Sequence, residues 1–90
     1  MAADDSSNRI ADSTDEELVE QLQAASRDDL RSFDELVRRH RARVMTNCRY
    51  LTGNPGHAED LTQEVFVKAY FALQRFQHRS KFRTWIQRIK

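Results

Sequence analysis

The sequence predicts an all-α fold, a compact bundle of about four helices. The first reason is composition, because only one Pro and two Gly occur among 90 residues. The second is periodicity, because apolar residues recur at spacings of three and four over several segments. The third is that no segment alternates in the manner of a strand, and we find no internal repeat. Ninety residues suit one small domain with a modest core.

The first helix is expected to begin at Thr14, after an acidic, polar tail over residues 1–13 that we expect to be disordered. Thr14 and Glu17 have the spacing of a capping box, in which each side chain binds the other residue's backbone N–H. The apolar stripe of this helix consists of Leu18, Leu22 and Ala25. The segment 26–29 is expected to break or bend the helix.

A longer helix is expected over residues 30–52. Its apolar stripe consists of Phe33, Leu36, Val37, His40, Val44, Cys48 and Leu51. We interpret His40 as a packed histidine and Cys48 as a small buried side chain, because the histidines and the cysteine lack metal-ligand spacing. Gly53 is a natural residue to end this helix, and residues 54–56 predict a turn.

The third helix is expected to start near Ala58 and to end near Phe76, with His57 either capping it or lying in the preceding loop. Residues 77–80 predict a short polar loop. Ser80 is expected to cap the last helix. The buried stripe of that helix is predicted to be Phe82, Trp85, Ile86 and Ile89.

The third predicted helix is apolar on more than one side. At about 100° per residue, one side gathers Leu61, Val65, Ala69, Ala72, Leu73 and Phe76, with Phe66 at its edge. The opposite side carries Asp60, Gln63, Glu64, Val67, Phe71 and Gln74. An exposed Phe beside a Val, bordered by polar groups, is typical of an interface. The alternative is that the helix near the N-terminus covers this side.

Charge is distributed unevenly along the chain although the net charge is only +1. Residues 1–35 hold eleven acids and three Arg, whereas residues 36–90 hold three acids and twelve Lys or Arg. Residues 75–90 hold six basic residues and no acid. This polarity indicates either a polyanionic partner for the second half or a solvated basic face.

Cations and aromatics alternate around the loop before the last helix. They are Arg75, Phe76, Gln77, His78, Arg79, Lys81, Phe82, Arg83 and Trp85. Phosphates attract the cations and unstacked bases attract aromatic faces, so the pattern fits nucleic acid. For Phe82 and Trp85 we favour a core role instead, because their spacing matches the apolar stripe. On the last helix, Arg83, Gln87 and Lys90 share one face, with Thr84 and Arg88 beside it.

Several functional classes are disfavoured. The single Cys48 excludes an internal disulfide and fits a reducing compartment. No apolar run approaches the roughly 18 residues of a membrane span, so we expect a cytoplasmic protein without membrane insertion. Glu59, Asp60 and Glu64 lack a nucleophile or a Gly-rich phosphate loop beside them. We therefore expect no enzyme, no metal and no cofactor.

Three segments, "AEDLTQEVFVKAY", "ALQRF" and "FRTWIQRI", occur in the order and at the spacing of a known family. On these segments the chain resembles region 2 of bacterial extracytoplasmic-function (ECF) sigma factors, from about Thr14 to Lys90. The resemblance implies a transcription-initiation domain that binds core RNA polymerase. In the family, the helix matching Asp60–Phe71 docks on the clamp helices of the largest polymerase subunit. The positions implied are Asp60, Gln63, Glu64, Val67, Tyr70 and Phe71.

The resemblance also implies a promoter surface that recognises and melts the −10 element. In the family, the loop between the last two helices captures a base flipped out of the non-template strand. The DNA-binding positions implied are Arg75, Phe76, Gln77, His78, Arg79, Ser80, Lys81, Arg83, Thr84, Gln87 and Arg88. A second basic surface is expected at Arg38, Arg39, Arg41 and Arg43. An anti-sigma factor is a further partner that the resemblance implies.

The sequence departs from the family in the loop, where Gln77-His78-Arg79-Ser80 stands in place of a frequent Arg-Gly-Asp-Ser. The family also continues the last helix and adds a linker and a second helical domain, so the resemblance implies that this chain is a fragment.

Two rival functions stay open. One is a helix-turn-helix module that prefers duplex DNA, and the other is a regulator-docking bundle that binds no nucleic acid.

Overall fold

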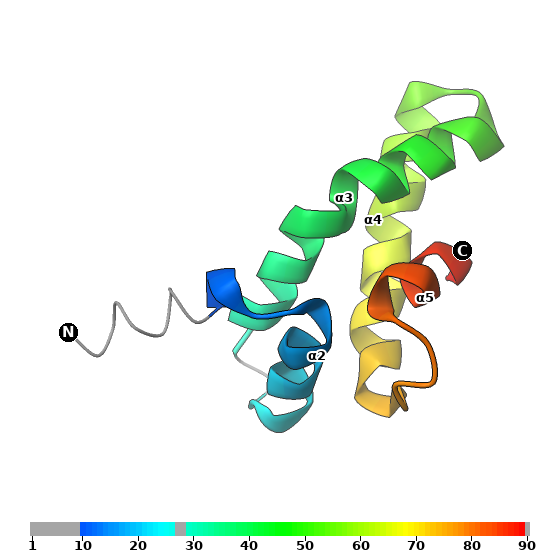
Figure 1. Ribbon diagram of the computed structural model, residues 1–90. Helices are drawn as coiled ribbons and strands as arrows, with labels where there is room; N and C mark the ends of the chain where they lie inside the picture. Colours follow the sequence, from blue (N-terminus) through cyan, green and yellow to red (C-terminus); the bar gives the residue numbers. More distant parts are fainter. Residues whose placement is uncertain (1–9, 27–28, 90) are drawn as a thin grey trace.

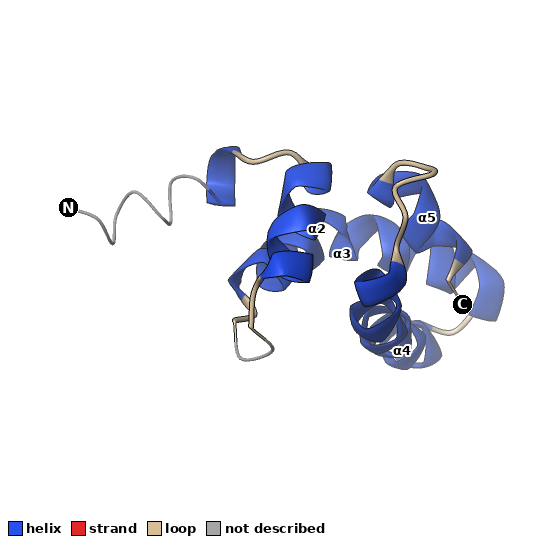
Figure 2. Ribbon diagram, turned by 90° about the horizontal axis from the view of Figure 1, so that it is seen from below, coloured by secondary structure: helices blue, strands red, loops and turns tan. Residues whose placement is uncertain are grey.

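The computed structural model describes residues 10–26 and 29–89 and contains only helices and loops within them (Figures 1 and 2). The elements are α2 (Asp15–Ala24), α3 (Arg31–Thr52), α4 (Pro55–Ala72), the 3₁₀ turn η1 (Leu73–Arg75) and α5 (Phe82–Arg88). α3 and α4 run side by side, and α2 and α5 pack across one end of this pair (Figure 1). The all-α prediction is confirmed.

The start of α2 forms the predicted capping box. The N–H of Thr14 donates to Glu17 Oε1 at 2.8 Å, and the N–H of Glu17 donates to Thr14 Oγ1 at 3.1 Å. A helical turn over residues 10–12 precedes α2, and Ile10 packs against the core. The expected disorder is therefore wrong for residues 10–13, while residues 1–9 lie outside the described residues.

The connection between α3 and α4 is tighter than the predicted turn. Gly53 ends α3 with a left-handed φ of 66°, as expected. Pro55 and Gly56 are helical, however, so α4 begins three residues earlier than predicted and His57 lies in its first turn. Asn54 is the cap, because its Oδ1 accepts from the N–H groups of Gly56 at 2.9 Å and His57 at 3.2 Å. A Pro at the first helical position loses no hydrogen bond.

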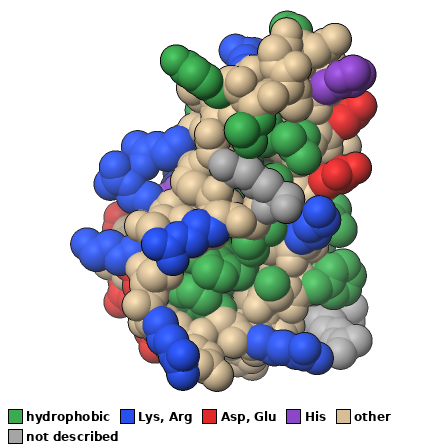
Figure 3. Space-filling view, turned by 90° about the vertical axis from the view of Figure 1, so that its right-hand side faces the viewer, with side chains coloured by type: hydrophobic (Ala, Val, Ile, Leu, Met, Phe, Trp, Pro, Cys, Tyr) green, Lys and Arg blue, Asp and Glu red, His purple; other side chains and the backbone are tan. Residues whose placement is uncertain are grey.

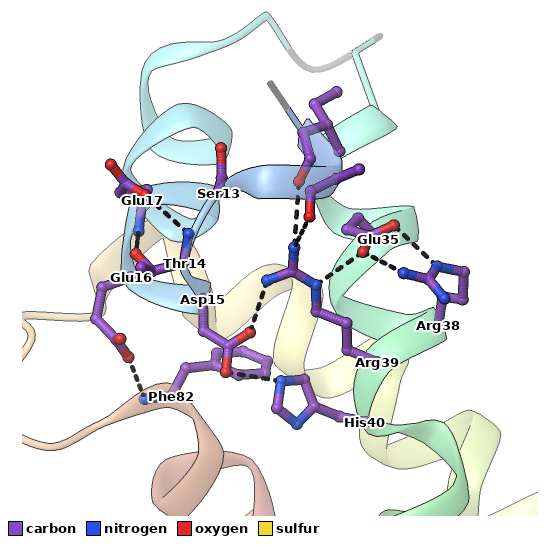
Figure 4. Close-up of polar contacts among 12 residues, drawn as sticks. Ser13, Thr14, Asp15, Glu16, Glu17, Glu35, Arg38, Arg39, His40 and Phe82 are labelled. Carbon is purple, nitrogen blue, oxygen red and sulfur yellow. Dashed lines mark hydrogen bonds and ion pairs between the residues drawn. The ribbon is translucent and has the colours of Figure 1, made fainter. Parts of the chain in front are cut away.

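The loop before α5 also differs from the prediction. α4 ends at Ala72 and tightens into η1, whereas the sequence predicted a helix to Phe76. Lys81, and not Ser80, precedes the first residue of α5, and it makes no side-chain cap. The N–H of Phe82 donates instead to Glu16 Oε2 at 3.1 Å (Figure 4). A carboxylate from α2 thus satisfies a backbone group that the local sequence leaves without a partner.

Most of the predicted apolar stripes form the core. The buried apolar residues are Leu18, Val19, Leu22, Leu36, Val44, Cys48, Ala58, Val65, Phe66, Ala69, Leu73, Phe82 and Ile86. His40 is buried as predicted, and its ring lies 5.1 Å from that of Phe82. Leu51 was assigned to the stripe wrongly, since its exposed fraction is 60%. Trp85 and Ile89 are only half-buried at the edge of the core.

A polar network joins α2 to α3 (Figure 4). Asp15 accepts from Arg39 at 3.3 Å and lies 2.9 Å from His40 Nε2. Glu35 accepts from Arg38 at 2.9 and 2.6 Å and from Arg39 at 2.7 Å. These arginines, Arg38 first, lower the pKa of Glu35 from 4.5 to about 2 although burial opposes the shift.

We predict that Glu35→Gln makes the fold less sensitive to acid. Because the folded pKa of Glu35 is lowered, its contribution is present above pH 4.5 and is lost as the pH falls toward 2. The variant should lose about 1 kcal/mol near neutral pH, since Arg38 is mostly exposed and solvent screens its charge. Its free energy of unfolding should then converge on that of wild type in acid. Urea unfolding across this pH range measures both values, and parallel curves for the two proteins would contradict the assignment.

A second prediction compares two aromatic residues of α5. Phe82→Ala should cost about 3–5 kcal/mol, because Phe82 is fully buried. Trp85→Ala should cost less, about 1–3 kcal/mol, because part of the indole is already in water. Chemical denaturation gives both values. A larger loss for Trp85→Ala would show that the indole, and not Phe82, is the anchor of α5.

Candidate polymerase and nucleic-acid surfaces

One side of α4 is exposed along most of its length. Val67 and Phe71 have exposed fractions of 58% and 69%. The polar residues Asp60, Gln63 and Glu64 are exposed on the preceding turns of the same side. We call these five residues the exposed α4 face. α2 does not cover this face, so that alternative is wrong.

Two further residues shape the exposed α4 face. Lys68 lines a hollow together with Asp60, Gln63, Glu64 and Val67, and the sequence reasoning did not single it out. Tyr70 is half-buried, and its ring packs in T-shaped pairs with the rings of Phe33 and Phe71, with centroids 5.1 Å and 5.4 Å apart. The ring of Tyr70 therefore supports Phe71 from the side. Its predicted contact role stays a prediction.

The loop between η1 and α5 brings aromatic rings together and exposes its cations. Gln77, His78, Arg79 and Lys81 are exposed, and Ser80 is half-buried. His78 has a φ of 58°, which is unusual for a residue other than Gly. This is the loop position at which the family often has Gly, the residue that adopts a positive φ most easily. The ring of His78 lies 4.9 Å from that of Phe76, which lies 5.0 Å from Trp85.

The expected face of α5 is formed only in part. Arg83, Thr84 and Arg88 are exposed, whereas Gln87 is half-buried and turned toward α3. There Gln87 Oε1 accepts from Asn47 Nδ2 at 2.8 Å, and Gln87 Nε2 is buried without a hydrogen-bond partner. The prediction that Gln87 shares a face with Arg83 is therefore wrong for its side chain. Lys90 lies outside the described residues.

The basic side chains form a broad but broken surface. Figure 3 shows mostly Lys and Arg among the foreground charges of the face that carries α5, with hydrophobic side chains between them. Arg75 is exposed near this surface, at the end of η1. The expected second basic surface is reduced, because Arg39 is mostly buried in the network with Asp15 and Glu35. Arg38 is exposed but pairs with Glu35, and Arg41 and Arg43 are exposed as well.

Two kinds of feature are absent from the part of the chain that the structure describes. Among residues 10–26 and 29–89, no group of three His, Cys, Asp or Glu side chains could hold a metal ion. In the same ranges, no helix is long and apolar enough to cross a membrane.

Comparison with known proteins identifies the family. A match to Sigma-70 region 2 covers residues 36–89. The ECF RNA polymerase sigma factor SigE of Mycolicibacterium smegmatis is 45% identical over 58 residues, which are 64% of this chain and 22% of that protein. The RNA polymerase sigma-H factor of Pseudomonas aeruginosa is 39% identical over 75 residues, 83% of this chain and 37% of that protein. The ECF RNA polymerase sigma-E factor of Escherichia coli K12 is 40% identical over 77 residues, 84% of this chain and 38% of that protein.

The chain therefore spans less than two-fifths of the length of these relatives. No solved structure matches it significantly. The family match nevertheless covers more than half of the chain and includes α4, the loop and α5. The chain belongs to the sigma-70 region 2 family, and two of the relatives that it resembles are ECF RNA polymerase sigma factors.

Proposed function

We propose that this domain docks on core RNA polymerase through the exposed α4 face. The observation that carries the proposal is that Val67 and Phe71 stay exposed on a helix whose other side packs in the core. Burial of an aromatic side chain at the centre of an interface supplies much of its binding energy. The acids Asp60 and Glu64 would add steering toward a basic partner. The clamp helices of the largest polymerase subunit are the partner that the family implies.

We assign the loop and α5 to the −10 element of promoter DNA. Between Arg75 and Arg88 the chain has five Lys or Arg and no acid. The rings of Phe76 and His78 provide a stacking surface beside these cations. Extrusion of a base from duplex DNA costs a few kcal/mol, which stacking and polar contacts in the loop would offset. The domain would then recognise the non-template strand and help to melt the promoter.

The wider biology follows from the family. Polymerase would perform all the chemistry, so the domain itself would be no enzyme and would need no cofactor. It would act in the cytoplasm, where bacterial polymerase works. An anti-sigma factor that covers the exposed α4 face or the basic surface would hold it inactive.

We predict that Gln63→Ala combined with Glu64→Ala weakens capture of bacterial core RNA polymerase at least about tenfold. Both side chains are exposed on α4, so helicity should be unchanged. Asp34→Ala, which removes one exposed acid from α3, is the matched control and should bind as wild type. A pull-down, with circular dichroism for folding, measures the effect. Equal capture of the double variant and wild type would place the docking surface elsewhere.

A second experiment separates this function from a helix-turn-helix module. A labelled random-sequence oligonucleotide pool is titrated with the domain, first single-stranded and then as duplex. We expect tighter binding to the single strands, with a dependence on salt that becomes shallower in Arg83→Ala combined with Arg88→Ala. Thr84→Ala is the control, because it changes the same helix without removing charge. Preference for duplex would favour the helix-turn-helix module, and no binding would favour a regulator-docking bundle.

A further inference from the structure

Side chains of α2 form hydrogen bonds to the backbone at both ends of the loop that we assign to DNA. Gln23 Nε2 donates to the carbonyl oxygens of Leu73 at 2.8 Å and Phe76 at 3.0 Å. Glu16 Oε2 accepts from the N–H of Phe82 at 3.1 Å (Figure 4). All three hydrogen bonds are partly buried, and they join residues at least 50 positions apart in the sequence.

We propose that Glu16 and Gln23 are positioning residues that fix the span of the DNA-contacting loop. The two residues lie seven apart on α2, which is about two helical turns or 10 Å along one side of the helix. Gln23 holds the point where the chain leaves η1, and Glu16 holds the first residue of α5. The distance between the two ends of the loop is thereby set by the length of a rigid helix. This inference rests on the proposed DNA role of the loop.

The loop has little else to define its conformation. Among the described residues, no hydrogen bond involves residues 77–80, and the ring contact between His78 and Phe76 is their one aromatic contact. His78 also holds a backbone conformation that costs about 1 kcal/mol for a residue with a side chain. A strained segment without internal hydrogen bonds keeps one shape only if its ends are held. The bonds from α2 supply that restraint.

The positions of the two residues separate this role from DNA contact. Glu16 is an acid, so its direct electrostatic effect on bound DNA would be repulsion. Simple electrostatics therefore predicts that removal of this charge strengthens DNA binding. Positioning predicts the opposite, because a loop with loose ends must be ordered when DNA binds. The direction in which DNA affinity changes therefore distinguishes electrostatic repulsion from positioning.

The test compares Glu16→Ala combined with Gln23→Ala with wild type and with Glu20→Ala. Glu20 is an exposed acid one turn further along α2, so its variant reports the effect of charge alone. We expect the double variant to bind the single-stranded pool about tenfold more weakly. We expect Glu20→Ala to bind it as well as wild type or slightly better. Capture of core polymerase should stay within about twofold for both variants, because the exposed α4 face is untouched.

Glu16→Gln provides a conservative rescue. Its amide oxygen can still accept from the N–H of Phe82, although without charge. We expect this single variant to retain more DNA affinity than Glu16→Ala. Equal losses in the two would contradict a role for the hydrogen bond at Phe82.

Hydrogen exchange tests the restraint without DNA, so a failure of the restraint can be told apart from a failure of the proposed function. In the double variant, the hydrogen-bonded backbone amides at the two ends of the loop, those of Phe76 and Phe82, should exchange at least about tenfold faster, with α3 and α4 unchanged. Unchanged exchange in the loop would overturn the positioning role. Faster exchange throughout the domain would also overturn it, since Glu16 and Gln23 would then only stabilise the fold. Faster exchange confined to the loop, in a protein whose wild type binds no DNA, would refute the proposed function and leave the restraint established.

Discussion

The rest of the structure depends on the burial of one side of α2. Leu18 and Val19 are fully buried, and α2 packs against α3, η1 and α5. Its apolar side closes the core at the end where α4 stops and α5 begins. Its polar side chains then form hydrogen bonds with these neighbours. Asp15 bonds to α3, Gln23 to η1 and Glu16 to α5. A short acidic helix near the N-terminus thus organises a basic region some 60 residues later.

A second constraint acts on α4. The helix must bury Val65, Phe66 and Ala69 against its neighbours and still present Val67 and Phe71 to water. Exposure of two apolar side chains in one row contributes nothing to the stability of the isolated domain. Such a row makes physical sense as a surface for another protein. The support of Phe71 by Tyr70, and of Tyr70 by Phe33, keeps the exposed ring in place before a partner arrives.

The helices and much of the core could be predicted from periodicity, because amphipathic order is a local property of the sequence. Local sequence also predicted the helix caps at Thr14 and Gly53. It likewise predicted the exposure of Val67 and Phe71. The Asn54-Pro55 start of α4 was also encoded locally, since Pro is favoured at a first helical position, but the Asn-Pro-Gly run suggested a turn. Leu51 was misassigned, since it lies in the last turn of α3 with its side chain exposed.

Other features depend on contacts between distant segments and could not be predicted. Nothing near Phe82 shows that a carboxylate from α2 will cap α5, since Ser80 is a plausible local cap. The turn of Gln87 toward Asn47 likewise depends on the packing angle between α3 and α5. Arg39 was predicted to face a partner, but the acids of α2 and α3 bind it within the domain. In each case a hydrogen bond between distant segments determines the local structure, and the pattern of one helix alone does not reveal that bond.

We propose that polymerase docks on the exposed α4 face and not on another exposed apolar site. Site-specific photo-crosslinking tests this claim directly, with benzoylphenylalanine replacing Phe71 in one protein and Tyr50 in another. Both side chains are aromatic and exposed, at 69% and 90%, and Tyr50 lies on α3 outside the exposed α4 face. We expect a crosslink from position 71 to the largest subunit of core RNA polymerase and none from position 50. A crosslink from position 50 with none from position 71 would contradict it.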